Sequence, residues 1–95
     1  MFVLRHKTLK TFVAIKSTHS IDMEVKEVLV DSSELSETCQ YEEISLFATL
    51  SREKMVRILD AARTVYGAAV PEGMYLSEYT CNIPYIAHDY EIVEL

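Results

Sequence analysis

The segment from Ser51 to Tyr66 restricts the fold of this chain most strongly, because it carries the pattern of one amphipathic helix. Apolar residues recur there at the 3.6-residue spacing that places side chains on one helix face: Met55, Ile58, Leu59, Ala62, Val65 and Tyr66. Ser51 is a residue type that caps helix N-termini, and Glu53 lies in the first turn, where the helix dipole favours negative charge. Gly67 is a residue type that often ends a helix. The rest of the chain must therefore supply a surface that covers the apolar stripe.

Alternating apolar and polar residues predict strands on both sides of this helix. Residues 2–7 and 12–16 alternate around a short polar break and predict an N-terminal hairpin. Apolar residues occupy both faces of the second of these strands, as in a strand inside a sheet. Residues 23–30 fit either a strand or one short helix, and their valines favour a middle strand. The ending YEIVEL predicts a final strand. Residues 44–50 predict a short strand that leads into the helix.

The remaining segments predict loops, because they are polar or hold the prolines. Residues 17–22 predict a loop, and residues 31–43 predict a loop or a short helical turn begun by Ser32 or Ser33. Residues 68–89 predict a winding connection that leaves room for one short strand or turn. The predicted fold class is α+β, with a small, mainly antiparallel sheet made of the N-terminal hairpin, the middle strand and the C-terminal strand, packed against one main helix. A length of 95 residues predicts a single domain over residues 1–95.

Composition restricts the compartment and the partners that we expect. No apolar run approaches the ~18 residues that a membrane helix needs, and the N-terminus lacks the order of a secretory signal. We therefore expect a cytoplasmic protein with no membrane partner. The two cysteines, Cys39 and Cys81, have 41 residues between them and form no paired metal motif. Free structural thiols are the expectation, and one disulfide or a redox role stays open.

Charged residues are distributed unevenly along the chain. Residues 1–20 carry four basic residues and no acidic one, whereas residues 21–95 carry five basic and 15 acidic residues. The formal net charge is −6. Binding to duplex DNA usually needs a basic face with many Lys and Arg residues, so we expect no direct DNA binding. A local anion site on the basic N-terminal segment stays open.

The basic segment supplies the first candidate site. A guanidinium group makes bidentate contacts with phosphates and carboxylates. Four side chains of this segment could therefore bind a phosphate or an acidic partner: Arg5, His6, Lys7 and Lys16. Arg5 and Lys7 share one strand face, whereas His6 projects from the other. A solvated strand face is the alternative interpretation.

Tyrosines near the C-terminus supply the second candidate site. Tyr75, Tyr79 and Tyr85 lie, with Tyr90, in the last 21 residues. A tyrosine joins a flat apolar body to a polar tip, which suits protein interfaces and base stacking. Packing in the core or at its rim is the alternative interpretation for these residues.

The middle of the chain is acidic. Lys26 is its one basic residue, against seven acidic residues: Glu24, Glu27, Asp31, Glu34, Glu37, Glu42 and Glu43. Such a stretch could imitate a nucleic-acid backbone and occupy the basic cleft of a host enzyme. A solvated acidic surface explains it equally well.

The sequence holds no catalytic or metal-binding motif. Its three histidines lack H-x-x-x-H spacing, and it has no G-x-S-x-G, Walker or H-E-x-x-H pattern. We therefore expect a protein that is not an enzyme and that needs no metal or cofactor.

Three segments resemble parts of small uncharacterised accessory (early) proteins of tailed bacteriophages. They are FVLRHK near the start, SLFATLSREKMVRILDAA in the middle and HDYEIVEL at the end, which together cover about half of the chain. The resemblance implies a strand, a strand with a helix, and a closing strand, and identifies no active site. It also implies a setting, since products of accessory phage genes often modify or block a host protein or a defence pathway.

These observations lead to the hypothesis of a phage accessory protein that binds and inhibits a host or anti-phage defence component in the cytoplasm of the infected cell. The alternative is an oligomeric sponge that sequesters a nucleotide-like immune signal between Arg5 or Lys7 and tyrosines such as Tyr79 or Tyr85. An opening strand at a sheet edge would favour symmetric pairing into a homo-oligomer. A structural or regulatory module is a third hypothesis.

Overall fold

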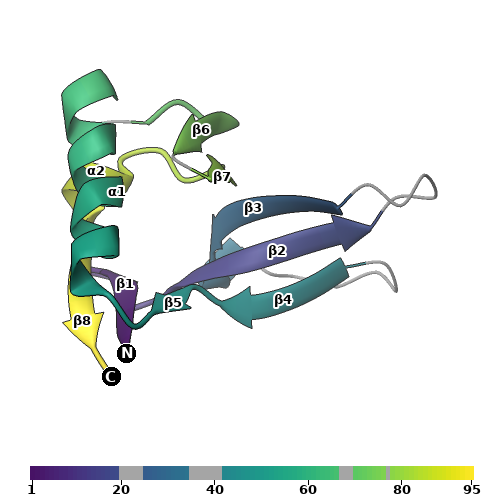
Figure 1. Cartoon of the computed structure of the whole chain (residues 1–95), viewed down its shortest axis with the longest axis horizontal. Coiled ribbons are helices and arrows are strands. Elements are labelled where there is room, and N and C mark those ends of the chain that lie inside the picture. Colours follow the sequence, from purple (N-terminus) through teal and green to yellow (C-terminus); the bar gives the residue numbers. More distant parts are fainter. Residues whose placement is uncertain (20–24, 35–41, 67–69, 77) are drawn as a thin grey trace.

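The computed structural model describes residues 1–19, 25–34, 42–66, 70–76 and 78–95, and it has the predicted α+β fold (Figure 1). Two sheets and one long helix account for most of these residues. The elements follow in the order β1 (Phe2–His6), β2 (Val13–His19), β3 (Val25–Asp31), η1 (Ser32–Glu34), β4 (Glu42–Leu46), β5 (Ala48–Thr49), α1 (Arg52–Tyr66), β6 (Met74–Leu76), β7 (Tyr79–Cys81), α2 (Ile86–Asp89) and β8 (Tyr90–Glu94).

Helix α1 forms where the sequence predicts it. The backbone N–H of Lys54 donates a hydrogen bond of 3.4 Å to Ser51 Oγ, so Ser51 caps the helix. The apolar stripe is buried at its four described positions: Met55, Ile58, Leu59 and Ala62. The exposed pair between Arg57 and Glu53 is 2.8 Å long, and such pairs contribute only about 0.2–0.5 kcal/mol. Burial of the stripe therefore holds α1 in place.

The predicted N-terminal hairpin is corrected by the structure, because its two strands enter different sheets. β1 belongs to a three-stranded sheet of order β5-β1-β8, and β2 belongs to a five-stranded sheet of order β4-β2-β3-β7-β6. An isolated bridge joins Arg5 of β1 to Phe12, the residue before β2. β1 instead pairs along its whole length with β8, and β2 pairs along its whole length with β3. These long ladders outweigh the local hairpin.

Both β1 and β2 are interior strands of their sheets. β2 lies between β3 and β4, which confirms that it is an interior strand. β1 lies between β5 and β8, so it does not take the edge position that would favour symmetric pairing. β8 pairs with β1 from Phe2 to His6 on one side, and β5 pairs with Phe2 and Val3 on the other. The argument for symmetric pairing through β1 is thereby lost.

Several segments that predict loops hold regular structure. Residues 17–19 continue β2, because β3 pairs with all three of them and β4 pairs with Ser17 and Thr18. Residues 68–89 contain the antiparallel pair β6–β7 and the short helix α2. The helical turn η1 is confirmed, but its cap is Asp31 rather than Ser32 or Ser33, since Ser33 N–H donates to Asp31 Oδ1 at 2.8 Å.

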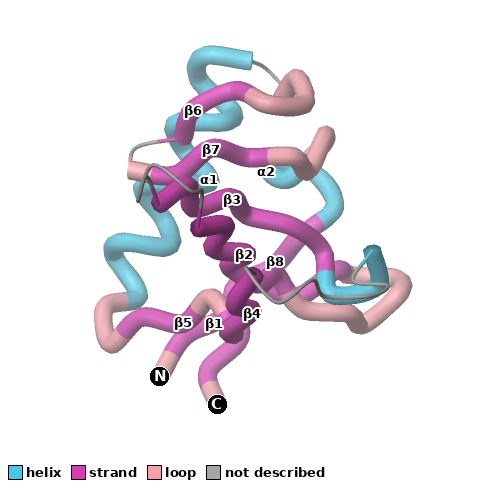
Figure 2. The backbone as a smooth tube through the Cα atoms, turned by 90° about the vertical axis from the view of Figure 1, so that its right-hand side faces the viewer, coloured by secondary structure: helices cyan, strands magenta, loops and turns pink. Residues whose placement is uncertain are grey.

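The core lies between α1 and the inner faces of the two sheets. Phe47, 1 % exposed, stands between β4 and β5, where the chain passes from one sheet to the other. Its ring meets the ring of Tyr79 edge-on, with centroids 5.2 Å apart. Figure 2 shows β6, β7, β3, β2 and β4 following one another across the larger sheet. The two chain ends meet beside β1 and β8, where Leu95 N–H donates to Met1 O at 2.7 Å (Figure 1).

Replacing Leu59 by alanine tests the packing of α1 directly. Leu59 is 8 % exposed, and removing a buried leucine side chain costs about 2–5 kcal/mol. We expect urea denaturation to show that loss in the free energy of unfolding. The matched control is Asp60→Ala on the exposed face of the same turn, which should change stability by no more than about 0.5 kcal/mol. Equal effects of the two changes would contradict this account of the helix.

Candidate functional site

A row of side chains crosses the outward face of the five-stranded sheet. The strand registers place five residues opposite one another in succession: Ile44, Lys16, Val28, Thr80 and Tyr75. Directly opposite residues share a face of the sheet. Their sequence neighbours Leu29 and Cys81 are buried in the core, so the row lies on the opposite face, away from the core. We call these five residues the outer row.

The outer row brings together two residues that the sequence analysis selected separately. Lys16 lies near the start of the chain and Tyr75 near its end, yet three strand spacings of about 4.8 Å place them about 14 Å apart on one face. Tyr75 is 72 % exposed. Val28, Thr80 and Ile44 are half-buried, and they complete the row without having been predicted.

A groove of about 520 Å³ opens between β3 and the β6–β7 pair beside this row. Its lining consists of Val25, Lys26, Glu27, Val28, Tyr75, Glu78 and Thr80. Val25, 53 % exposed, and Tyr75 leave large apolar surfaces in contact with solvent around it. Charged side chains border these apolar groups, which is the layout of a small protein interface. Strands β2, β3 and β4 extend away from α1, so the β3 side of this surface stands clear of the helix (Figure 1).

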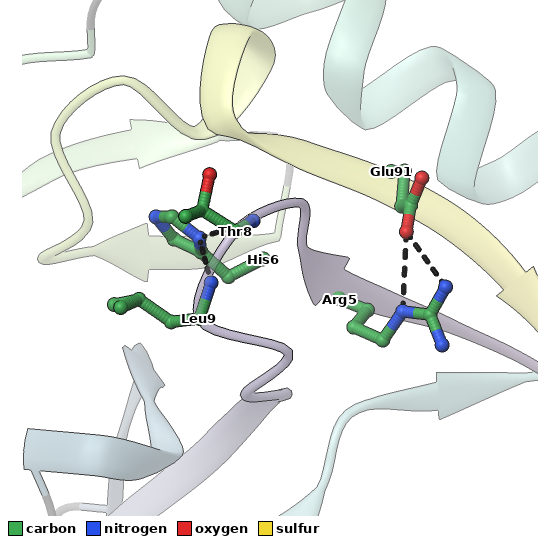
Figure 3. Close-up of polar contacts among 5 residues, drawn as sticks. All are labelled: Arg5, His6, Thr8, Leu9 and Glu91. Atoms are coloured by element: carbon green, nitrogen blue, oxygen red, sulfur yellow. Dashed lines mark hydrogen bonds and ion pairs between the residues drawn. The ribbon is translucent and has the colours of Figure 1, made fainter.

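Arg5 is paired within its own sheet. Its Nη2 and Nε lie 2.8 and 3.1 Å from Glu91 Oε1 on the neighbouring strand β8 (Figure 3). The guanidinium beside Glu91 lowers the pKa of that carboxyl. Arg5 therefore carries a compensated charge, and it does not line the groove beside the outer row.

Lys7 lies at the end of helix α2. Its Nζ donates to the His88 carbonyl at 2.9 Å, and its backbone N–H donates to the Asp89 carbonyl at 2.8 Å. A lysine satisfies the unpaired carbonyl groups at such a helix end. Since β1 and β2 enter different sheets, Arg5 and Lys7 are separated from Lys16, and the three predicted cations do not form one cluster.

His6 stabilises the turn that follows β1. Its Nδ1 accepts hydrogen bonds from Thr8 N–H at 3.1 Å and from Leu9 N–H at 3.0 Å (Figure 3). Lys10 adopts a positive φ of 61° in the same turn, which has no glycine. The imidazole therefore supplies the acceptor that holds a strained turn closed. The sequence analysis considered this histidine only as a possible phosphate ligand and did not predict its role in the turn.

Tyr79 and Tyr85 have different surroundings. Tyr79 is half-buried against Phe47, and Lys54 Nζ lies 5.7 Å from the centroid of its ring, so Tyr79 contributes to packing. Tyr85, at the start of α2, is exposed and takes a φ of 64°. It lines a second groove of about 210 Å³, whose lining includes the three carboxylates Asp31, Glu34 and Asp89. Such a lining repels phosphate.

Asp31 belongs to the interior, although it was predicted as part of an acidic surface. It is 5 % exposed and accepts hydrogen bonds from Thr11 Oγ1 at 2.9 Å, from Ser33 N–H at 2.8 Å, from Ser33 Oγ at 2.6 Å and from the Tyr90 hydroxyl. Burial acts to raise the pKa of Asp31, but the hydrogen bonds from Ser33, Tyr90 and Thr11 outweigh it and lower that pKa. This network joins β3 to β8. Two other members of the acidic stretch, Glu24 and Glu37, lie outside the described residues.

Two other buried side chains, Tyr90 and Cys81, have raised pKa values. Burial and the Asp31 carboxylate raise the pKa of Tyr90. Burial also raises the pKa of the Cys81 thiol to about 11, slightly opposed by its hydrogen bond with Ile83. Both groups are thus protonated at neutral pH. Cys81 is a free, buried thiol, as predicted, and Cys39 lies outside the described residues.

A third groove, of about 630 Å³, lies along α1 and is lined by Ser51, Lys54, Arg57, Ile58, Ala61 and Glu78. Its cations have carboxylate partners, since Lys54 lies 3.8 Å from Glu78 and Arg57 lies 2.8 Å from Glu53. The sequence analysis missed this cluster because Glu78 reaches it from the β6–β7 turn.

Within the described ranges, no group of three or more His, Cys, Asp or Glu side chains is arranged to hold a metal ion. None of the helices described has the length and apolar character needed to cross a membrane. Comparison with models of protein families finds no match, and comparisons with curated proteins and with solved structures find none either. The surface described above is therefore interpreted from its own chemistry.

Acid should weaken the Asp31 network. The pKa of Asp31 is lower in the folded chain than its ordinary value of 3.8. The ionised carboxylate therefore stabilises the fold at pH values above 3.8, and this contribution is lost as the pH falls through the pKa of the folded state. We expect Asp31→Asn to cost about 1–3 kcal/mol at pH 7, because the hydrogen bonds to a buried carboxylate are lost. The difference from the wild-type chain, measured by urea denaturation, should shrink below pH 4. Asp60→Asn on the surface is the control, and a pH-independent difference for Asp31→Asn would contradict the assignment.

The Cys81 thiol should be unreactive in the folded chain. With a pKa of about 11, only about one thiol in a thousand is ionised at pH 8, and the sulfur is also buried. In a Cys39→Ser variant, we expect a disulfide reagent to label Cys81 at least about 100-fold faster in urea than in buffer. Similar rates in the two conditions would show that Cys81 is accessible.

Proposed function

We propose that this protein is a non-enzymatic binding protein that acts by covering a surface of another protein. The observation that carries the proposal is the exposure of Tyr75 and Val25 around one groove, which opens between β3 and the β6–β7 pair. Apolar side chains that remain in contact with water on a folded surface are typical of interaction sites. The outer row and the groove form the contact surface in this proposal.

The chemistry of this surface supports a protein partner. Tyrosine is among the residues that contribute most to binding energy at interfaces, because its ring buries a large area at low entropic cost. Val25 and Val28 extend the apolar area, and Lys26, Glu27 and Glu78 form a charged rim. An apolar centre with a charged rim suits a partner surface of the same layout.

The resemblance to accessory proteins of tailed phages supports the biological setting of the proposal. In that setting the partner is a host or anti-phage defence component, and its binding in the cytoplasm of the infected cell inhibits it. A small chain that covers a surface acts stoichiometrically, so inhibition requires amounts comparable to those of the partner.

The nucleotide-like sponge has less support as a second function. Arg5 is paired with Glu91, and the groove beside Tyr85 includes three carboxylates in its lining. The cations of the groove along α1 also have carboxylate partners. A phosphate group would have to displace these carboxylates before it could bind.

Replacing Tyr75 by serine tests the proposed surface. Tagged wild-type and variant chains are purified from infected bacterial cells, and the proteins that accompany them are quantified by mass spectrometry. Because removal of a central interface tyrosine costs about 2 kcal/mol or more, we expect recovery of the partner to fall at least about tenfold. The matched control is Leu50→Ser, since Leu50 is 86 % exposed and does not line the groove.

Two results would contradict the proposal. One is equal recovery of the same partner with Tyr75→Ser and with the wild-type chain. The other is thermal stabilisation of the purified chain by a nucleotide, which would favour the sponge, since a ligand that binds only the folded state raises the unfolding temperature.

A further inference from the structure

Strand β3 has an open backbone edge along its first three residues. β2 pairs with β3 from Val25 to Asp31, whereas β7 pairs with it only at Val28 and Leu29. On the β7 side, none of the described strands pairs with residues 25–27. The groove of about 520 Å³ lies along this stretch.

The backbone groups of Val25 and Glu27 point toward this open edge. Asn82 N–H donates to the Leu29 carbonyl at 3.0 Å, so Leu29 directs its backbone groups toward β7. Residues two apart in a strand direct their N–H and C=O groups to the same side. Glu27 and Val25 lie two and four residues before Leu29, so they present two N–H and two C=O groups to the groove. Such an edge is a template for another strand.

From this geometry we infer that an extended segment of a partner protein binds in the groove as an added strand beside Val25–Glu27. The inference rests on the proposed function and specifies how the partner is held. Backbone hydrogen bonds to Val25 and Glu27 supply affinity, and alternate side chains of the segment supply specificity.

The lining of the groove determines the chemistry of the segment. Side chains on the outward face meet Tyr75, Val28 and Thr80, which suit an apolar residue. Charges in the lining come from Lys26, Glu27 and Glu78, so acidic groups are in excess. Glu27 makes no ion pair with another described residue. A basic residue next to an apolar one complements this lining.

A second copy of the chain fits this edge poorly. Antiparallel pairing about a twofold axis that uses all three open residues places Val25 opposite Glu27 and Lys26 opposite Lys26 of the copy. Like charges directly opposite one another in a ladder are destabilising. A foreign segment is free of this constraint, so the charges favour it over self-pairing.

Proline at position 25 separates the backbone contribution from that of the side chain. Val25→Pro removes the backbone N–H that faces the groove. Val25→Ala removes a similar part of the side chain but keeps this N–H. Position 25 begins β3 and is exposed, so both variants should unfold at similar urea concentrations. The two variants therefore form a matched pair.

The test uses a random heptapeptide library, selected on the immobilised full-length chain, followed by fluorescence anisotropy with the enriched peptides. We expect enriched peptides with alternating apolar residues and at least one Lys or Arg. Val25→Pro should weaken their binding at least tenfold relative to Val25→Ala. Replacing the basic residue of the peptide by alanine should weaken binding severalfold to the wild-type chain and less to Glu27→Gln.

Three results would overturn the inference. They are equal binding to Val25→Pro and Val25→Ala, enrichment of peptides without a basic residue, and a wild-type dimer in sedimentation that Val25→Pro converts to a monomer. Failure here is distinguishable from failure of the proposed function. A partner whose recovery depends on Tyr75 but not on the N–H of residue 25 would leave the binding surface intact and remove only the added strand.

Discussion

The buried carboxylate of Asp31 is the constraint on which the arrangement of the two sheets depends. A buried charge is tolerated only when hydrogen bonds replace its lost water, and the donors to Asp31 come from three separate parts of the chain. Thr11 belongs to the turn after β1, Ser33 to η1 and Tyr90 to the start of β8. One end of β3 is thereby fixed to the smaller sheet. The other end, at Val25, extends away from this junction and carries the open edge.

This junction also explains why the basic N-terminal segment does not form one site. The chain changes sheet between β1 and β2, and His6 holds the turn where the change occurs. Arg5 and Lys7 remain with β8 and α2, whereas Lys16 joins the outward face of the larger sheet. A cluster that looks continuous along the sequence is divided by the fold. In the outer row that results, Val28 and Thr80 lie between Lys16 and Tyr75.

The fold was predictable from the sequence where its signal is local. The stripe of α1, the valines of β3 and the ending of β8 each appear within a few residues, and the structure confirms them. Strand partners were not predictable, because Arg5 and Glu91 are 86 positions apart and no local pattern encodes that register. The same limit applies to the candidate site, where Tyr75 and Lys16 were selected but Val28, Thr80 and Ile44 were missed. Asp31 was assigned to the surface because composition alone cannot show that Tyr90 would reach it.

The hydrogen bond between Leu95 and Met1 has a consequence for the way this fold can be connected to other chains. Because both ends emerge at one corner, polypeptide that enters there can leave from the same place without crossing the domain. The unit is thus suited to insertion into a surface loop of a carrier protein, and to circular permutation with a short joining linker. Either rearrangement would keep the β1–β8 ladder and leave the far end of the larger sheet unobstructed.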